Sequence, residues 1–333
     1  DAVQQYKDDR DPRELLFQFK RCMVHFAVDD ARVKFCTKLD GKNSWFLPFD
    51  KGYNDGAGNP PNPDGLMTDY LWKKILTKDK LSRIIENYAQ VVVEEDPETK
   101  KKSVKQIFPR YHQLDCVEKL LADVKTNGVG KRYLIQHSAG SGKTNSIAWL
   151  AHQLIGLEKD GHPMIDSVLV VTDRRILDKQ IRDNIKQFMQ VANTVAWAEH
   201  SGDLRKAIQA GKRIIITTVE KFPYVVPDIG AAHKTKHFAV IIDEAHSGQN
   251  GRNSAQMNLA LSGLASEDEM DNEDKINAML EGRKLLPNAS YFAFTATPKN
   301  KTLETFGTLV VDENGNPVLN EDGEAQHRPF HSY

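Results

Sequence analysis

The feature that most constrains this chain is a glycine-rich loop that joins a strand-like segment to a helix-like one. The loop, residues 137–144, reads His-Ser-Ala-Gly-Ser-Gly-Lys-Thr, with apolar residues 133–135 before it and an apolar stripe at helical spacing after it. Gly140 and Gly142 let the backbone turn so that its N–H groups point inward, towards an anion. One position departs from the strict pattern, because His137 stands where the first glycine would be. Strand, loop and helix in this order predict a phosphate-binding loop.

The residues at the end of the loop carry its chemistry. Gly140, Ser141 and Gly142 would surround nucleotide phosphates with backbone N–H groups. Lys143 supplies a mobile positive charge for the β- and γ-phosphates, and the Thr144 hydroxyl supplies a ligand for Mg²⁺. These residues predict ATP and Mg²⁺ as cofactors. The alternative is a helix N-terminus capped by Gly and Ser, whose lysine is only solvated.

The composition of the chain indicates the broad class of protein to which it belongs. The chain has 333 residues, 40% hydrophobic and 27% charged, which is typical of a globular protein with room for two domains. Its net charge of −1 means that any nucleic-acid binding must come from a local surface. Three cysteines, Cys22, Cys36 and Cys116, show no metal-ligand spacing, and neither a membrane-length apolar run nor a signal peptide is present. We therefore expect a cytoplasmic protein without a membrane contact.

Further apolar runs follow the loop and predict a parallel sheet. They lack alternation, which is typical of strands buried on both faces, and they cover residues 167–171, 213–218, 238–242 and 291–294. Each run ends in polar residues. In such sheets ligands bind at the carboxyl ends of the strands, so we expect these polar residues to gather beside the phosphate-binding loop.

An acidic pair follows one of these runs. Asp243 is placed to hold Mg²⁺ opposite Thr144, and Glu244 can orient and deprotonate the water that attacks the γ-phosphate. The alternative for Asp-Glu-Ala-His is a helix N-terminus with an acidic first turn. Its place behind a strand, about 100 residues after the loop, favours the metal site.

Gln113 lies about 30 residues before Lys143, at the start of a predicted helix. Its amide carries both a donor and an acceptor, and so matches the N6 and N7 edge of adenine. By itself it would be an exposed glutamine at a helix start. Its position ahead of the nucleotide loop makes it a candidate adenine reader.

These residues together resemble helicases and translocases of superfamily two. Residues 137–144 resemble motif I of that family, residues 243–246 motif II and residues 295–297 motif III. The resemblance implies catalytic roles for Lys143, Asp243, Glu244 and His246, and roles for Thr295 and Thr297 in coupling the nucleotide state to DNA movement. It also implies that Arg174, Thr217 and Thr218 touch DNA phosphates. The alternative for Arg174 is that it begins a helix and its charge is only solvated.

A narrower resemblance extends outside these motifs. Residues 8–17, 19–26, 58–63, 136–146 and 329–333 resemble the restriction (motor) subunit of type I restriction-modification enzymes. The resemblance implies an ATP-dependent deoxyribonuclease that moves double-stranded DNA before cutting it, and partners that supply methyltransferase and specificity subunits. We expect the chain to be an excerpt that lacks the nuclease catalytic residues and the second ATPase lobe.

The expected fold class is α/β: a RecA-like parallel sheet with flanking helices, preceded by a smaller mixed α/β segment. Residues 1–49 would be the trailing part of a nuclease-type domain, and residues 50–105 a Gly- and Pro-rich loop followed by a helical linker. Residues 106–300 would form the first RecA-like lobe, and 301–333 a connection towards the missing lobe. Two other functions stay open: a strand-separating helicase, and a scaffold that binds ATP without hydrolysing it.

Overall fold

The computed structural model describes residues 2–11, 13–54, 56–95, 99–172, 195–198, 201–218, 235–243, 288–320 and 323–333. The chain divides into two compact units, residues 1–118 and 119–333, with the boundary inside a helix, α3 (Tyr111–Asn127). This boundary lies further along the chain than residue 106, where the sequence places the start of the RecA-like lobe. Among the helices that the structure describes, none is long and apolar enough to span a membrane.

The first unit is built on a small antiparallel sheet of β1 (His25–Val28), β2 (Val33–Cys36) and β3 (Leu47–Pro48). A second antiparallel pair lies in the segment that the sequence assigned to a loop and helical linker. The other elements of the unit are α1 (Ala2–Gln4), η1 (Gln5–Asp9), η2 (Leu15–Phe17), η3 (Leu71–Ile75), α2 (Lys78–Asn87), β4 (Gln90–Glu95) and β5 (Lys102–Ile107). The linker is therefore a mixture of helix and hairpin.

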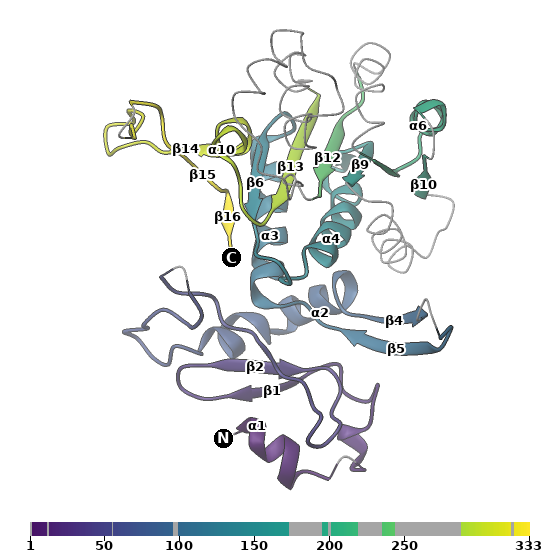
Figure 1. Ribbon diagram of the computed structural model, residues 1–333, viewed down its shortest axis with the longest axis vertical. Coiled ribbons are helices and arrows are strands. Elements are labelled where there is room, and N and C mark those ends of the chain that lie inside the picture. Colours follow the sequence, from purple (N-terminus) through teal and green to yellow (C-terminus); the bar gives the residue numbers. More distant parts are fainter. Residues whose placement is uncertain are drawn as a thin grey trace. The chain divides into compact units, whose positions relative to one another are not determined.

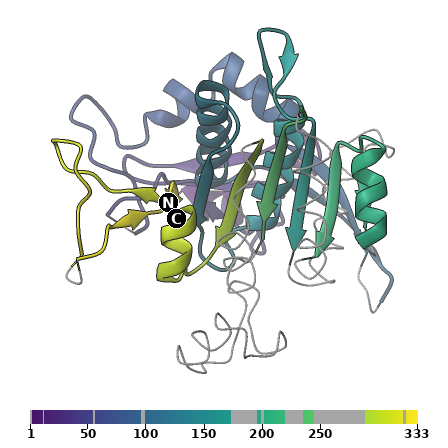
Figure 2. The ribbon, with the colours of Figure 1, turned by 90° about the horizontal axis from the view of Figure 1, so that it is seen from above.

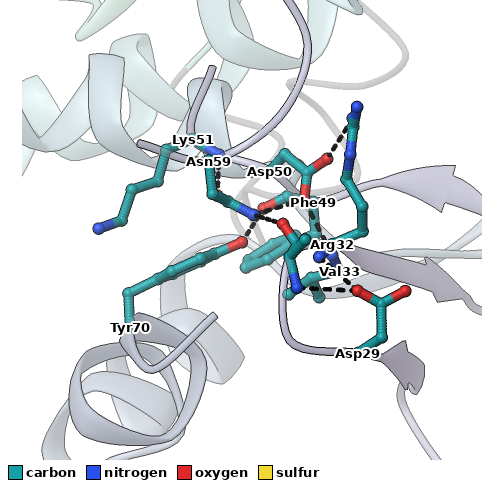
Figure 3. Close-up of polar contacts among 9 residues, drawn as sticks. Asp29, Arg32, Val33, Phe49, Asp50, Lys51, Asn59 and Tyr70 are labelled. Atoms are coloured by element: carbon teal, nitrogen blue, oxygen red, sulfur yellow. Dashed lines mark hydrogen bonds and ion pairs between the residues drawn. The ribbon is translucent and has the colours of Figure 1, made fainter. Parts of the chain in front are cut away.

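Buried polar groups hold the loop after β3 in place (Figure 3). One carboxylate oxygen of Asp50 accepts hydrogen bonds from the Val33 N–H and from the Asn59 side chain, both at 2.8 Å. The Tyr70 hydroxyl donates to the Phe49 carbonyl at 2.8 Å. Burial, reinforced by the nearby Asp50 carboxylate, raises the pKa of Tyr70, so this hydroxyl stays a donor. The described residues of the predicted loop, 50–54 and 56–65, thus belong to no helix or strand, and these hydrogen bonds hold the loop at Asp50 and Asn59.

The second unit is organised around a seven-stranded sheet in the order β10-β11-β9-β12-β13-β6-β16, and every neighbouring pair is parallel (Figure 1). This confirms the expected RecA-like α/β class. The strands are β6 (Arg132–Gln136), β9 (Ser167–Thr172), β10 (Val195–Trp197), β11 (Ile214–Thr218), β12 (Phe238–Ile242), β13 (Ala289–Thr295) and β16 (His331–Ser332). All residues of β9, β11, β12 and β13 are buried, as their unbroken apolar runs predict.

Helices cover the sheet (Figure 2). One face packs into an apolar core with α6 (Ser201–Gln209) and α10 (Asn300–Phe306), whose buried residues include Leu204 and Phe306. Helix α4 (Lys143–Ile155) packs on β9 and β12 but contributes no residue to that core. Because successive residues of a strand point to opposite faces of the sheet, α4 covers the other face. Short hairpins complete the unit: β7 (Glu158–Lys159) with β8 (His162–Pro163), and β14 (Thr308–Leu309) with β15 (His327–Arg328).

Strand β16 joins the last residues of the chain to the main sheet. It pairs with β6, with His331 opposite Ile135 and Ser332 opposite Gln136. The role of residues 301–333 as a connection towards a second lobe stays a prediction. A strand of two residues is too short to give a periodic signal in the sequence. The strand that leads into the phosphate-binding loop therefore has a neighbour on each side.

Candidate nucleotide-binding site

The predicted loop has the backbone that phosphate binding requires. Strand β6 ends at Gln136 and α4 begins at Lys143, so residues 137–142 form the connection. Gly140 and Gly142 have φ of 75° and 84°, in the left-handed region that side chains with a Cβ rarely adopt. Apart from its chain neighbours, no residue that the structure describes lies within 4 Å of the position that a Cβ of Gly140 would take. The positive φ angles therefore require the glycines for the turn itself.

Lys143 is held inside this loop. It is the first residue of α4 and only 8% exposed. Its ammonium group donates to the carbonyl oxygens of His137 at 3.2 Å and Ser138 at 3.4 Å. These two carbonyl oxygens are neutral acceptors, and a phosphate oxygen is a stronger one because it carries charge. This arrangement does not fit the alternative of a solvated lysine.

The oxygen donors suit Mg²⁺. Thr144 is half-buried at the start of α4, and Asp243 directly follows β12 with 2% exposure, its N–H donating to the Val171 carbonyl at 2.9 Å. Carboxylate and hydroxyl oxygens are the ligands that this small, hard cation prefers. One strand, β13, separates β6 from β12, which places the two strand ends about 10 Å apart along the same edge. These two residues would hold the cation together with phosphate oxygens.

Thr295, a predicted coupling residue, is joined to the loop through the backbone. Its side chain is fully buried at the end of β13, and its carbonyl accepts a hydrogen bond from the His137 N–H at 2.9 Å. Thr297, two residues further on, is exposed. The end of β13 is therefore in direct hydrogen-bond contact with the loop, and the coupling role of Thr295 stays a prediction.

The two threonines predicted to contact DNA are buried in the sheet. Thr217 and Thr218 end β11 and are buried, and Thr218 lies opposite Thr172 of β9. Within the described part of the chain, their hydroxyls have no hydrogen-bond partner. Contact with a DNA phosphate would require their exposure, so this role stays a prediction. Arg174, Glu244 and His246 lie outside the described residues.

Gln113 belongs to the first unit. It is 3% exposed, and its side-chain oxygen accepts a hydrogen bond from the Arg110 N–H at 2.9 Å. Its acceptor therefore caps the start of its own helix, where backbone N–H groups lack intrahelical partners. This oxygen has a second lone pair and the amide has two N–H donors, so adenine reading is compatible with the cap and stays a prediction.

In the sequence, His137 stands out only because it occupies the position of the first glycine in the pattern. In the structure its ring is fully buried, and its Nε2 lies 2.8 Å from Nδ1 of His331 on β16. The Ser138 N–H also donates to the Tyr333 carbonyl, at 2.9 Å. Nearly 200 residues separate the partners, and no local pattern in the sequence signals the pairing.

Comparison with known proteins gives the family. A family model described as SWI2/SNF2 ATPase matches residues 112–313, more than half of the chain. A putative type I restriction enzyme MpnIIP endonuclease subunit, C-terminal part, from Mycoplasma pneumoniae is 30% identical over 158 residues, which are 43% of this chain and 73% of that protein. The type I restriction enzyme HindI endonuclease subunit from Haemophilus influenzae is 26% identical over 228 residues.

The two matches cover very different shares of the relatives' own lengths. The HindI match takes in 63% of this chain but only 19% of that subunit, whereas the Mycoplasma relative is itself a C-terminal part. Among solved structures, a fragment of a putative HsdR subunit of a type I restriction enzyme from Vibrio vulnificus aligns with a TM-score of 0.35 and 14% identity, covering 86% of this chain and 40% of that one. By its sequence relatives and its family match, this chain belongs to the SWI2/SNF2 ATPases and, among them, to the endonuclease subunits of type I restriction enzymes.

Proposed function

We propose that this chain is the ATP-binding first motor lobe of a type I restriction subunit, and that the full-length protein couples ATP hydrolysis to movement along duplex DNA before cleavage. The observation that carries the proposal is the loop around Lys143. A buried ammonium group, two left-handed glycines and the buried carboxylate of Asp243 lie along one edge of a parallel sheet. This is the set of groups that phosphoryl transfer from a nucleotide requires.

Each group has a distinct part in the proposed reaction. Loop N–H groups and Lys143 bind the triphosphate and offset its charge. Thr144 and Asp243 hold Mg²⁺, which supplies further charge stabilisation at the phosphates. Glu244, next to Asp243 in sequence, orients the attacking water and accepts its proton. Thr295 is placed to pass a change in the loop on to β13 through its carbonyl.

The proposed partners are double-stranded DNA and the methyltransferase and specificity subunits of a restriction-modification complex. Membership in the type I endonuclease-subunit family supports them. Thr217, Thr218 and Arg174 are the proposed DNA contacts. Because the net charge is −1, these contacts act locally, without a strongly basic overall surface.

Two displacement assays on the full-length protein test the proposal. A duplex motor with ATP is expected to remove a third strand from a triplex at a distance from its starting site, and to leave the two strands of a short forked duplex paired. Release of the forked strands would instead indicate a strand-separating helicase. If neither substrate responds in the presence of ATP and Mg²⁺, the motor assignment is wrong.

A further inference from the structure

Tyr333, which directly follows β16, is hydrogen-bonded to the end of β6 and to the phosphate-binding loop. The Tyr333 N–H donates to the Gln136 carbonyl at 2.8 Å, and the Tyr333 carbonyl accepts from the Ser138 N–H at 2.9 Å. These bonds continue the parallel pairing of β16 with β6 past the end of β6 and into the loop. The first half of the loop therefore has a fixed neighbour, whereas backbone in a surface loop is ordinarily mobile.

A pair of imidazoles reinforces this link. Nε2 of His137 and Nδ1 of His331 lie 2.8 Å apart, and the two residues are 0% and 8% exposed. One ring donates and the other accepts, so a single proton lies between them. The rings of Phe294 and Tyr333 lie edge-on to His137. The contact with His331 therefore adds a directional polar interaction to these aromatic contacts of the His137 ring.

The same two loop residues hold Lys143. The Lys143 ammonium group donates to the carbonyls of His137 and Ser138. Each of these residues also contacts the end of the chain: the His137 ring contacts His331 of β16, and the Ser138 N–H donates to the carbonyl of Tyr333, which follows β16. A displacement of either residue would move an acceptor of Lys143 and change the direction of the loop N–H groups.

We propose that His331 is a positioning residue of the nucleotide site: through His137 it holds the first half of the phosphate-binding loop, and with it Lys143, ready for a triphosphate. This inference rests on the proposed function. Its physical basis is preorganisation, because a loop already ordered before binding loses less conformational freedom when the ligand arrives. His331 itself touches neither the nucleotide nor the reacting atoms in this account.

The proposal predicts a specific defect for His331→Phe. Phenylalanine keeps a ring of similar size on β16 but cannot bond to His137. The KM for ATP of the full-length protein is expected to rise about fivefold, the effect of one lost hydrogen bond, with kcat changed by less than about twofold. His331→Asn places an amide atom at the same number of bonds from the backbone as Nδ1, and is expected to keep KM within about twofold of the wild-type value.

Phe330→Leu is the matched control. Phe330 precedes His331 and packs edge-on against Tyr133 of β6, with ring centroids 5.1 Å apart. The substitution weakens the docking of β16 but leaves the imidazole pair intact. We expect a lower melting temperature without nucleotide and an unchanged KM for ATP. An equal rise in KM for Phe330→Leu and His331→Phe would show that strand docking alone matters, and would overturn the role of His331.

The outcomes separate this inference from the function on which it rests. If the wild-type protein neither binds nor hydrolyses ATP, both are wrong. If the wild-type protein hydrolyses ATP and His331→Phe has the wild-type KM, the proposed function stands and the positioning role is wrong. If His331→Asn is as impaired as His331→Phe, the loss comes from packing rather than from the hydrogen bond, and the positioning role is again wrong.

Discussion

Replacing Lys143 with alanine is expected to reduce ATP turnover of the full-length protein to less than about 1% and to abolish duplex movement with it. The lysine is the cation that the structure places inside the loop, 3.2 Å and 3.4 Å from the carbonyls that hold it. Alanine leaves the helix start intact but removes the charge that would stabilise the phosphates in the transition state. Turnover measured at saturating ATP and Mg²⁺, with duplex DNA present, checks the prediction.

Lys131→Ala is the matched control for this variant. Lys131 precedes β6 at the opposite edge of the sheet, is exposed, and pairs with Asp123 at 3.3 Å. An exposed pair of this kind contributes little to stability, so the control should retain turnover and DNA binding. DNA binding without nucleotide should also survive in Lys143→Ala, because the lysine lies in the loop and not among the proposed DNA contacts. Unchanged duplex movement in Lys143→Ala would contradict the assignment of the site.

Replacing Asp243 with asparagine is expected to lower ATP turnover about 100-fold or more. Asp243 is 2% exposed and directly follows β12. Asparagine has nearly the same shape but no charge, so it would hold Mg²⁺ much more weakly than the carboxylate. Turnover measured across a Mg²⁺ titration tests the prediction, and the melting temperature shows whether the variant is folded.

Asp166→Asn provides the comparison. Asp166 precedes β9 at the other edge of the sheet, is exposed, and accepts a hydrogen bond from the His237 N–H at 2.7 Å. Its neutralisation should change neither turnover nor the Mg²⁺ dependence. A large fall in the melting temperature of Asp243→Asn without nucleotide would point to a structural role for the carboxylate. Full turnover at ordinary Mg²⁺ would exclude it as a metal ligand.

The part of the site nearest the loop could be predicted from the sequence because its signals are local. Gly140 and Gly142 are required by the turn, and the unbroken apolar runs of β9 and β12 give the buried parallel strands directly. Because the carboxyl ends of parallel strands meet at one edge, the position of Asp243 follows from the fold class alone.

What the sequence could not supply comes from contacts between distant residues or from burial. The pairing of His137 with His331 joins positions 194 residues apart, and the two-residue strand that carries it has no periodicity. The sequence places Gln113 at a helix start, but only the structure shows that its oxygen caps that helix; its role as an adenine reader stays a prediction. Thr217 and Thr218 lie at a strand end as predicted, yet only the packed sheet shows that they are buried.

We infer that this chain forms part of an ATPase that duplex DNA stimulates. ATP hydrolysis by the full-length protein, measured with and without duplex DNA, tests this inference beside a Glu244→Gln variant, which keeps the side-chain size but cannot accept a proton from water. We expect duplex DNA to stimulate hydrolysis by the wild-type protein, and we expect the variant to bind ATP without hydrolysing it. Binding of ATP by the wild-type protein without turnover under any DNA condition would contradict the inference and would indicate a nucleotide-dependent scaffold.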